Sequence, residues 1–189
     1  MSPAPRFVPL ARLLHWLMAA LLLSQLLIGV AMMATLTLRP PLIALHRPLG
    51  LALLVLVLVR LWVRRRHPPP ALPADLPRWQ AAAARASHLL LYALMLALPL
   101  LGWALASAAG NAVLLPGGVP LPAIAPHDPV LFGWLRDAHG LLAWLLFATV
   151  LGHVAAALHH AWIRRDGVFE AMAWRRRERP AENPWRTWR

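Results

Sequence analysis

Two histidines lie inside one long apolar stretch in the last third of the chain. His139 and His153 are fourteen residues apart, between Arg136 and Arg165. In an α-helix, fourteen residues make nearly four turns and rise about 21 Å, so both imidazoles project from one face at two heights. An ionisable side chain inside a membrane span is costly and marks a functional site by default, although hydrogen bonding to neighbouring helices is the alternative. The spacing predicts one helix that contributes a ligand to each of two stacked sites.

The composition is that of a membrane protein. Hydrophobic residues make up 60% of the 189 residues, charged residues make up 14%, and the mean hydropathy is +0.57. Four apolar runs are long enough to cross a bilayer of roughly 30 Å, and the first exceeds the roughly 7–15 apolar residues of a signal peptide. We predict an all-α fold, a transmembrane four-helix bundle in a single domain (1–189), with spans at about 13–36, 43–63, 84–107 and 133–163.

Residue usage narrows the chemistry. The chain has no Cys, which removes disulfides, Cys-ligated zinc, iron–sulfur clusters and covalently attached c-type haem, and leaves His, carboxylate and backbone as metal ligands. The net charge of +12 comes from Arg, because the chain has no Lys. The arginines flank the apolar spans and do not form a polar groove, so we predict a lipid bilayer as partner and no nucleic acid.

The distribution of Arg also predicts the orientation. All nineteen arginines except Arg39, Arg47 and Arg136 fall on or near one side of a four-span topology. By the positive-inside rule, both termini are cytoplasmic, and residues 164–189 form a cytoplasmic tail that begins as a short amphipathic helix. Arg60, near the far end of the second span, is predicted to extend toward the headgroups.

This topology pairs four histidines by depth. His15 begins the first span and His153 lies late in the fourth, so they share the cytoplasmic level, while His46 and His139 share the outer level. Two imidazoles from different helices can bind a flat macrocycle from both faces. Zinc normally requires a third or fourth ligand, and the predicted spans contain no carboxylate except Asp137, near the start of the fourth, so we predict two haem b groups. Two axial histidines leave iron no open position, which favours electron transfer over oxygen chemistry.

A glycine shares the outer level with one of these pairs. Gly29 follows His15 by fourteen residues, and therefore lies on the same face of its helix. It either admits the edge of the outer haem or lets two helices approach closely.

Five segments together resemble the bacterial cytochrome b561 family of four-helix, di-haem inner-membrane proteins, and they cover nearly the whole chain. They read RLLHWLMA, HRPLGLALLVLVLVRLWVR, PPPALPADLPRW, ASHLLLYALMLALPLLGW and GHVAAALHHAWIRRDGVF. The resemblance implies axial ligands at His15, His46, His139 and His153, in agreement with the pairing by depth. It further implies oxidation of periplasmic superoxide to dioxygen, with ubiquinone as the electron acceptor.

Further residues are candidates for the two substrates. His160 follows His153 by seven residues, on nearly the same face and about 10 Å nearer the cytoplasm, so we predict that it binds the quinone and supplies a proton; the alternative is a solvated interfacial histidine. His159 and Trp162 complete the predicted quinone site. We assign a catalytic role to Arg47 and Arg136, as cations that steer superoxide, with anchoring of haem propionates as the alternative.

Other functions remain open at this point. One is an electron-transfer subunit of a larger dehydrogenase or hydrogenase, which requires a stable partner and has no activity alone. Another is a haem-free metal-transporting or scaffold protein, which shows no haem spectrum.

His88 lies outside the ligand set, and we predict a structural role for it, bonded to a haem propionate.

Overall fold

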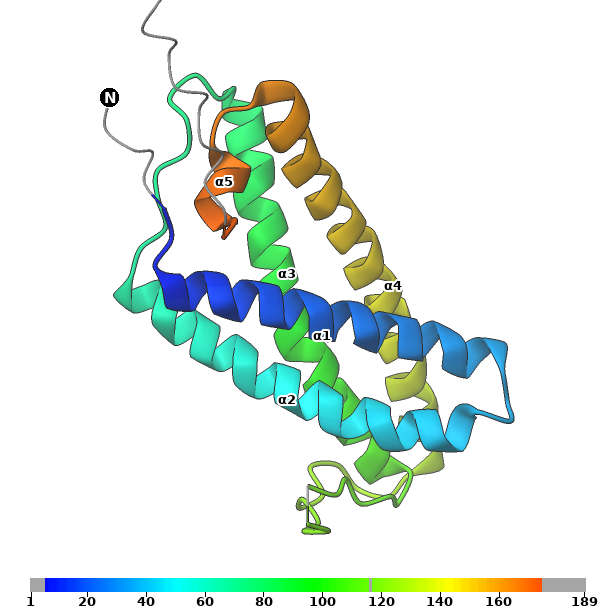
Figure 1. Ribbon diagram of the computed structural model, residues 1–189. Helices are drawn as coiled ribbons and strands as arrows, with labels where there is room; N and C mark the ends of the chain where they lie inside the picture. The colour runs from blue at the N-terminus through cyan, green and yellow to red at the C-terminus, as the bar shows by residue number, and fades with distance from the viewer. Residues whose placement is uncertain (1–5, 116, 175–189) are drawn as a thin grey trace, which may run out of the picture.

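The computed structural model describes residues 6–115 and 117–174, and four long helices dominate it (Figure 1). All four are long and apolar enough to cross a membrane, so the predicted all-α transmembrane bundle is confirmed, and no strand occurs within the described residues. Each helix begins before its predicted span. The helices are α1 (Pro9–Ala34), α2 (Arg39–Arg66), α3 (Arg78–Ala108) and α4 (Pro129–His159).

Proline starts three of these helices, where its missing N–H has no intrahelical partner to lose. It stands in the first turn of α1, α2 and α4. The start of α4 is fixed further by Asp128, whose Oδ1 accepts hydrogen bonds from the backbone N–H of Val130 at 2.7 Å and of Leu131 at 3.0 Å. This cap sets the register of the helix that carries two of the four paired histidines.

The helices form two antiparallel pairs. Helices α1 and α2 run side by side and cross the pair made by α3 and α4 (Figure 1). An apolar core of buried leucines joins α3 to α4, and partly buried leucines of α1 pack against it. Its buried members are Leu91, Leu94, Leu98 and Leu146.

Candidate functional residues and apolar residues alternate along each helix in steps of seven, which keeps them on nearly one face. The middle member of each series is apolar; Leu53 and Leu146 are buried, and Leu22 and Met95 pack in or against the core. The core therefore separates two levels, which we call inner (His15 and His153) and outer (His46 and His139) after the predicted orientation. The series are His15, Leu22 and Gly29; His46, Leu53 and Arg60; His88, Met95 and Gly102; and His139, Leu146 and His153.

The connection between α3 and α4 is irregular, and its described part is tied to the end of α3. Trp103 Nε1 donates to the carbonyl of Pro122 at 3.0 Å. His127 Nδ1 lies 3.0 Å from the carbonyl of Ala108, and its ring packs beside Gly110, whose φ of 72° is in the left-handed region. The loop is thus held over the outer end of the bundle.

The first and last described segments of the chain meet at the opposite end of the bundle. A π-helical turn η1 (His160–Arg164) extends α4, and a short helix α5 (Val168–Met172) follows. The N–H of Phe7 donates to the carbonyl of Ala171 at 3.2 Å, and Trp16 Nε1 donates to the carbonyl of Met172 at 3.1 Å. The predicted tail helix is therefore short and docked on the start of α1; residues 175–189 of that tail lie outside the described residues.

Candidate functional site

The outer level brings together His46 of α2 and His139 of α4. Their ring centroids are 6.3 Å apart and the ring planes make an angle of 67°. A metal ion bound by two opposed imidazoles, at roughly 2 Å from each nitrogen, separates the ring centroids by about 6 Å. The two side chains are thus placed at the separation that a shared metal requires.

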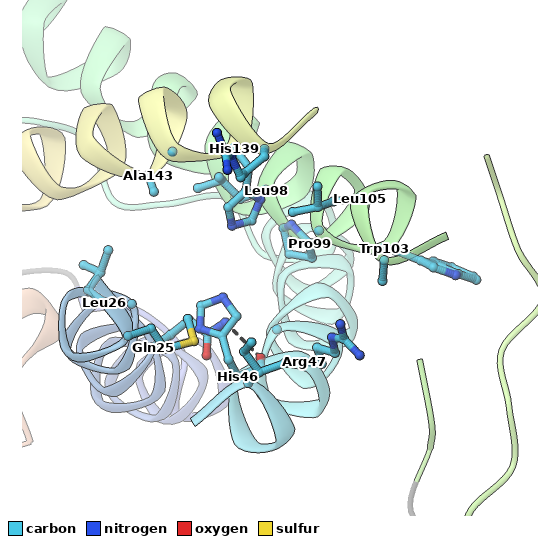
Figure 2. A pocket seen from close by; sticks show the side chains of 18 of the residues that line it. Gln25, Leu26, His46, Arg47, Leu98, Pro99, Trp103, Leu105, His139 and Ala143 are labelled. Carbon is cyan, nitrogen blue, oxygen red and sulfur yellow. Dashed lines mark hydrogen bonds between the residues drawn. The ribbon is translucent and has the colours of Figure 1, made fainter. Parts of the chain in front are cut away.

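A cavity of about 850 Å³ lies at this level, and all four helices line it. Its volume falls within the roughly 300–1,000 Å³ of cofactor pockets. Figure 2 shows His46 and His139 on opposite sides of the space, with Leu26, Leu98 and Ala143 among the apolar side chains around it. A large apolar cavity between two imidazoles suits a flat macrocycle with a central metal.

Three buried polar atoms at the cavity have no hydrogen-bond partner within the described chain. They are Nδ1 of His46, Nδ1 of His139 and Oε1 of Gln25. Buried polar atoms are normally paired, so each needs a partner that a cofactor or a rearranged side chain supplies. The residues present therefore fit a bis-histidine haem.

Glycines leave room for the macrocycle. A Cβ added to Gly29 would meet no heavy atom within 4 Å, so α1 makes no close helix contact there, and this favours space for a cofactor edge over helix approach. At Gly102 an added Cβ would lie 3.4 Å from Cε1 of His139, so glycine lets that ring pack on α3. Both glycines line the cavity.

At the inner level a second pair of histidines has the same separation of ring centroids, and its neighbours are more polar. His15 of α1 and His153 of α4 have ring centroids 6.3 Å apart with an interplanar angle of 71°. His88 of α3 lies beside them, with its ring centroid 5.4 Å from that of His153. The pairing by depth inferred from the sequence thus brings the expected side chains together at both levels.

Arg60 does not extend toward the headgroups, and that prediction was wrong. Its Nε donates to Tyr92 Oη at 3.1 Å, its NH1 donates to the carbonyl of Ala11 at 3.2 Å, and its NH2 lies 3.4 Å from Nδ1 of His15. The guanidinium turns inward because acceptors on α1 and α3 replace its hydration. Its position fourteen residues after His46 is the sequence signal that identifies it as an inner-level residue.

Three arginines surround the outer cavity. Arg39, Arg47 and Arg136 all line it, as does Asp137. Arg136 lies 3.4 Å from Asp137, and their side chains are 61% and 71% exposed. This exposed ion pair offsets part of the positive charge of Arg136, whereas none of the described ion pairs includes Arg39 or Arg47.

At the inner end, His160 belongs to an ionic network and is not a solvated histidine. Its Nδ1 lies 2.7 Å from Oδ2 of Asp166, and the two side chains are 16% and 10% exposed. Arg164 bridges Asp166 at 2.9 Å and the exposed Asp75 of the α2–α3 connector at 2.8 Å. Burial raises the pKa of Asp166, but hydrogen bonds from Arg164 and His160 outweigh it and hold that pKa below its usual value of 3.8.

The network coincides with the π-helical turn, a feature frequent at functional sites. The ring of His159 lies 6.0 Å from that of His160, between centroids, while Trp162 is 61% exposed. The structure therefore places the three predicted quinone residues on one turn. Sequence inspection missed Asp166 and Asp75, because their contact with this turn depends on how two connectors fold.

Comparison with known proteins gives consistent matches. Residues 6–175 match the family model described as prokaryotic cytochrome b561. The chain is 31% identical over 132 residues to cytochrome b561 homolog 1 of Escherichia coli K12, covering 70% of this chain and 74% of that protein. It is 28% identical over 174 residues to cytochrome b561 homolog 2 of the same organism, covering 88% and 90%.

A third relative carries a more specific name. The chain is 28% identical over 161 residues to the probable superoxide oxidase CybB of Yersinia pestis, with 84% of this chain and 90% of that protein covered. Because the family model spans most of the chain, the protein belongs to the prokaryotic cytochrome b561 family of haem b-binding electron-transfer proteins of bacterial membranes.

Proposed function

We propose that this cytochrome holds two haem b groups and transfers electrons from superoxide to ubiquinone. One haem lies between His15 and His153, and the other lies between His46 and His139. The observation that carries the proposal is that both pairs have the same 6.3 Å separation of ring centroids at two levels of one bundle. The name of the Yersinia pestis relative, probable superoxide oxidase, supports the choice of electron donor.

Bound haem supplies one-electron redox chemistry, and the chain's own residues decide how it is used. His15 with His153, and His46 with His139, would hold the iron of each haem from both sides and would keep dioxygen and water from it. The apolar core around Leu146 lies midway between the levels and excludes water from the space between them. Such a site moves electrons and does not activate oxygen.

The outer cavity is the proposed entrance for superoxide. Arg47 and Arg136, with Arg39 beside them, form a basic rim at its lining, and a positive field raises the local concentration of a small anion. Pairing of these arginines with haem propionates remains the alternative role. Two superoxide anions are oxidised to two dioxygen molecules, and the two electrons released pass to the inner level.

The inner end is the proposed quinone site. One ubiquinone accepts the two electrons and two protons and becomes ubiquinol. His160 is the proposed proton donor because Asp166 holds its Nδ1 and leaves Nε2 for the quinone oxygen. His159 and Trp162 on the same turn complete the contacts. His160→Ala is expected to slow quinone reduction while both haems stay bound; unchanged quinone kinetics would remove His160 from the site.

Single substitutions of the paired histidines test the proposal. His15→Ala or His153→Ala should lose the inner haem, and His46→Ala or His139→Ala the outer one, as measured by the pyridine haemochromogen method. His67→Ala in the α2–α3 connector is the control and should keep both. Two bound haems in any of the four variants would contradict the ligand assignment.

A direct assay separates the proposed oxidase from an electron-transfer subunit. The purified protein should reduce a ubiquinone analogue when superoxide is generated by a xanthine oxidase system, and added superoxide dismutase should suppress that reduction. Failure of the haem-loaded protein to reduce quinone alone, together with a partner that copurifies with it, would favour the subunit function.

A further inference from the structure

One polar side chain points from an otherwise apolar part of α1 into the outer cavity. Gln25 Nε2 donates to the backbone carbonyl of His46 at 3.0 Å, while its Oε1 is buried without a partner within the described chain. Figure 2 shows this carboxamide next to His46. Buried polar atoms in an apolar environment are normally hydrogen-bonded, so the unpaired Oε1 of Gln25 indicates a partner that binds there.

The neighbouring helix is shaped to allow this contact. A Cβ added to Gly50 of α2 would lie 3.3 Å from Nε2 of Gln25, which is closer than ordinary van der Waals contact. Glycine at this position therefore lets the carboxamide reach the backbone of His46. The contact joins α1 to α2 at the residue that carries a proposed haem ligand.

The unpaired acceptor, Oε1 of Gln25, can pair with the Nδ1 of His46. An imidazole that binds a metal through one nitrogen carries a proton on the other, and that N–H is usually hydrogen-bonded. Nδ1 of His46 is buried and has no partner among the described residues. Nδ1 of His139 is likewise buried without a partner within the described chain.

Other polar groups at the cavity do not provide this acceptor. Arg39, Arg47 and Arg136 only donate hydrogen bonds, and Asp137 is 71% exposed and pairs with Arg136. Asn111 also lines the cavity and has a carboxamide, but it is exposed in the α3–α4 connection. Gln25 has the buried acceptor, and its carboxamide already contacts the same residue.

We propose that Gln25 is a positioning residue for His46, and this proposal rests on the haem-binding function proposed above. One arm of its carboxamide holds the backbone of His46, and the other accepts the Nδ1–H of the ring when iron is bound. An acceptor on this N–H makes the imidazole a more basic ligand, which stabilises ferric iron. Gln25 therefore lowers the reduction potential of the outer haem relative to the inner haem and favours inward electron flow.

The test is a spectroscopic redox titration of the purified, haem-loaded protein. The outer haem is identified as the one that is lost in His46→Ala. In Gln25→Leu we expect the reduction equilibrium of the outer haem to shift by about tenfold toward the ferrous form. This is equivalent to a rise of about 59 mV in its reduction potential for one electron. The potential of the inner haem should not change.

Two further variants sharpen the test. Gly50→Ala displaces the carboxamide without removing it and should shift the outer haem in the same direction as Gln25→Leu. Ser24→Ala is the matched control, because Ser24 is exposed and its hydroxyl bonds only the carbonyl of Ala20 of its own helix; both potentials should stay unchanged.

The outcomes separate this proposal from the one on which it rests. Two bound haems with unchanged potentials in Gln25→Leu would overturn the role of Gln25 and leave the haem sites intact. Equal shifts in the reduction potentials of both haems would also overturn the role of Gln25, because the proposed contact is confined to the outer level. If Gln25→Leu fails to retain the outer haem, the Gly50→Ala titration decides. Two haems in His46→Ala would instead overturn the ligand assignment itself.

Discussion

Replacing Gly29 by leucine should weaken binding of the outer haem without disturbing the bundle. Gly29 lines the outer cavity, and a Cβ there would meet no heavy atom within 4 Å, so a larger side chain can leave the helix without a clash at its first atom and extend into the cavity. With haem bound, the same side chain competes with the macrocycle for space. Overpacking of this kind costs about 1–3 kcal/mol, which corresponds to roughly 5- to 150-fold weaker binding.

The assay is titration of haem into the purified, haem-depleted protein, followed by the Soret band, with thermal unfolding of the haem-free protein as a second readout. Gly152→Leu is the matched control, because its Cβ is equally unobstructed, while Gly152 is exposed on α4 and does not line the cavity. We expect weaker outer haem binding in Gly29→Leu alone. Equal affinity in wild type and Gly29→Leu would refute the placement of the macrocycle beside this glycine.

Three further predictions follow from the basic rim, the inner network and the core. Arg47→Gln or Arg136→Gln should slow haem reduction by superoxide in stopped flow, and the wild-type rate should fall as added salt shortens the Debye length from about 30 to about 8 Å; salt-independent rates equal in all three proteins would exclude steering. Because the pKa of Asp166 is lower in the folded state, its contacts stabilise the fold above pH 3.8, and this contribution is lost as pH falls through the lowered pKa. Asp166→Asn should therefore reduce the melting temperature at pH 7 and reduce it less in acid; an equal difference at both pH values would argue against the ionic contribution. Leu146→Ala removes a side chain that is 3% exposed and should destabilise the protein by about 2–5 kcal/mol in detergent while both haems still bind; an unchanged melting temperature would contradict its place in the core.

The four helices and the pairing of histidines were predictable because they depend on local pattern. Apolar runs of membrane-spanning length determine the helices, and multiples of seven residues keep side chains on one face. Alternation of direction between consecutive spans then brings His15 level with His153 and His46 level with His139. In the structure the ring centroids of each pair lie 6.3 Å apart, while the role of the four histidines as haem ligands stays a prediction.

What the sequence did not predict depends on contacts between distant residues. We expected Arg60 to extend toward the headgroups. The sequence of α2 alone does not indicate that its guanidinium bonds to Tyr92 on α3. The contact of Gln25 with His46 depends on how closely α1 approaches α2 at Gly50. The ion pair of Arg164 with Asp75 depends on the path of a proline-rich connector.

The haem b content per chain of the purified protein tests the central claim most directly. The pyridine haemochromogen method, referred to the protein concentration, should give two haems per chain, and the spectrum of the intact protein should show low-spin iron. We expect this because each level has two opposed imidazoles at the separation that one iron requires. One haem per chain, or a high-spin iron with an open axial position, would contradict the bis-histidine assignment at one or both levels.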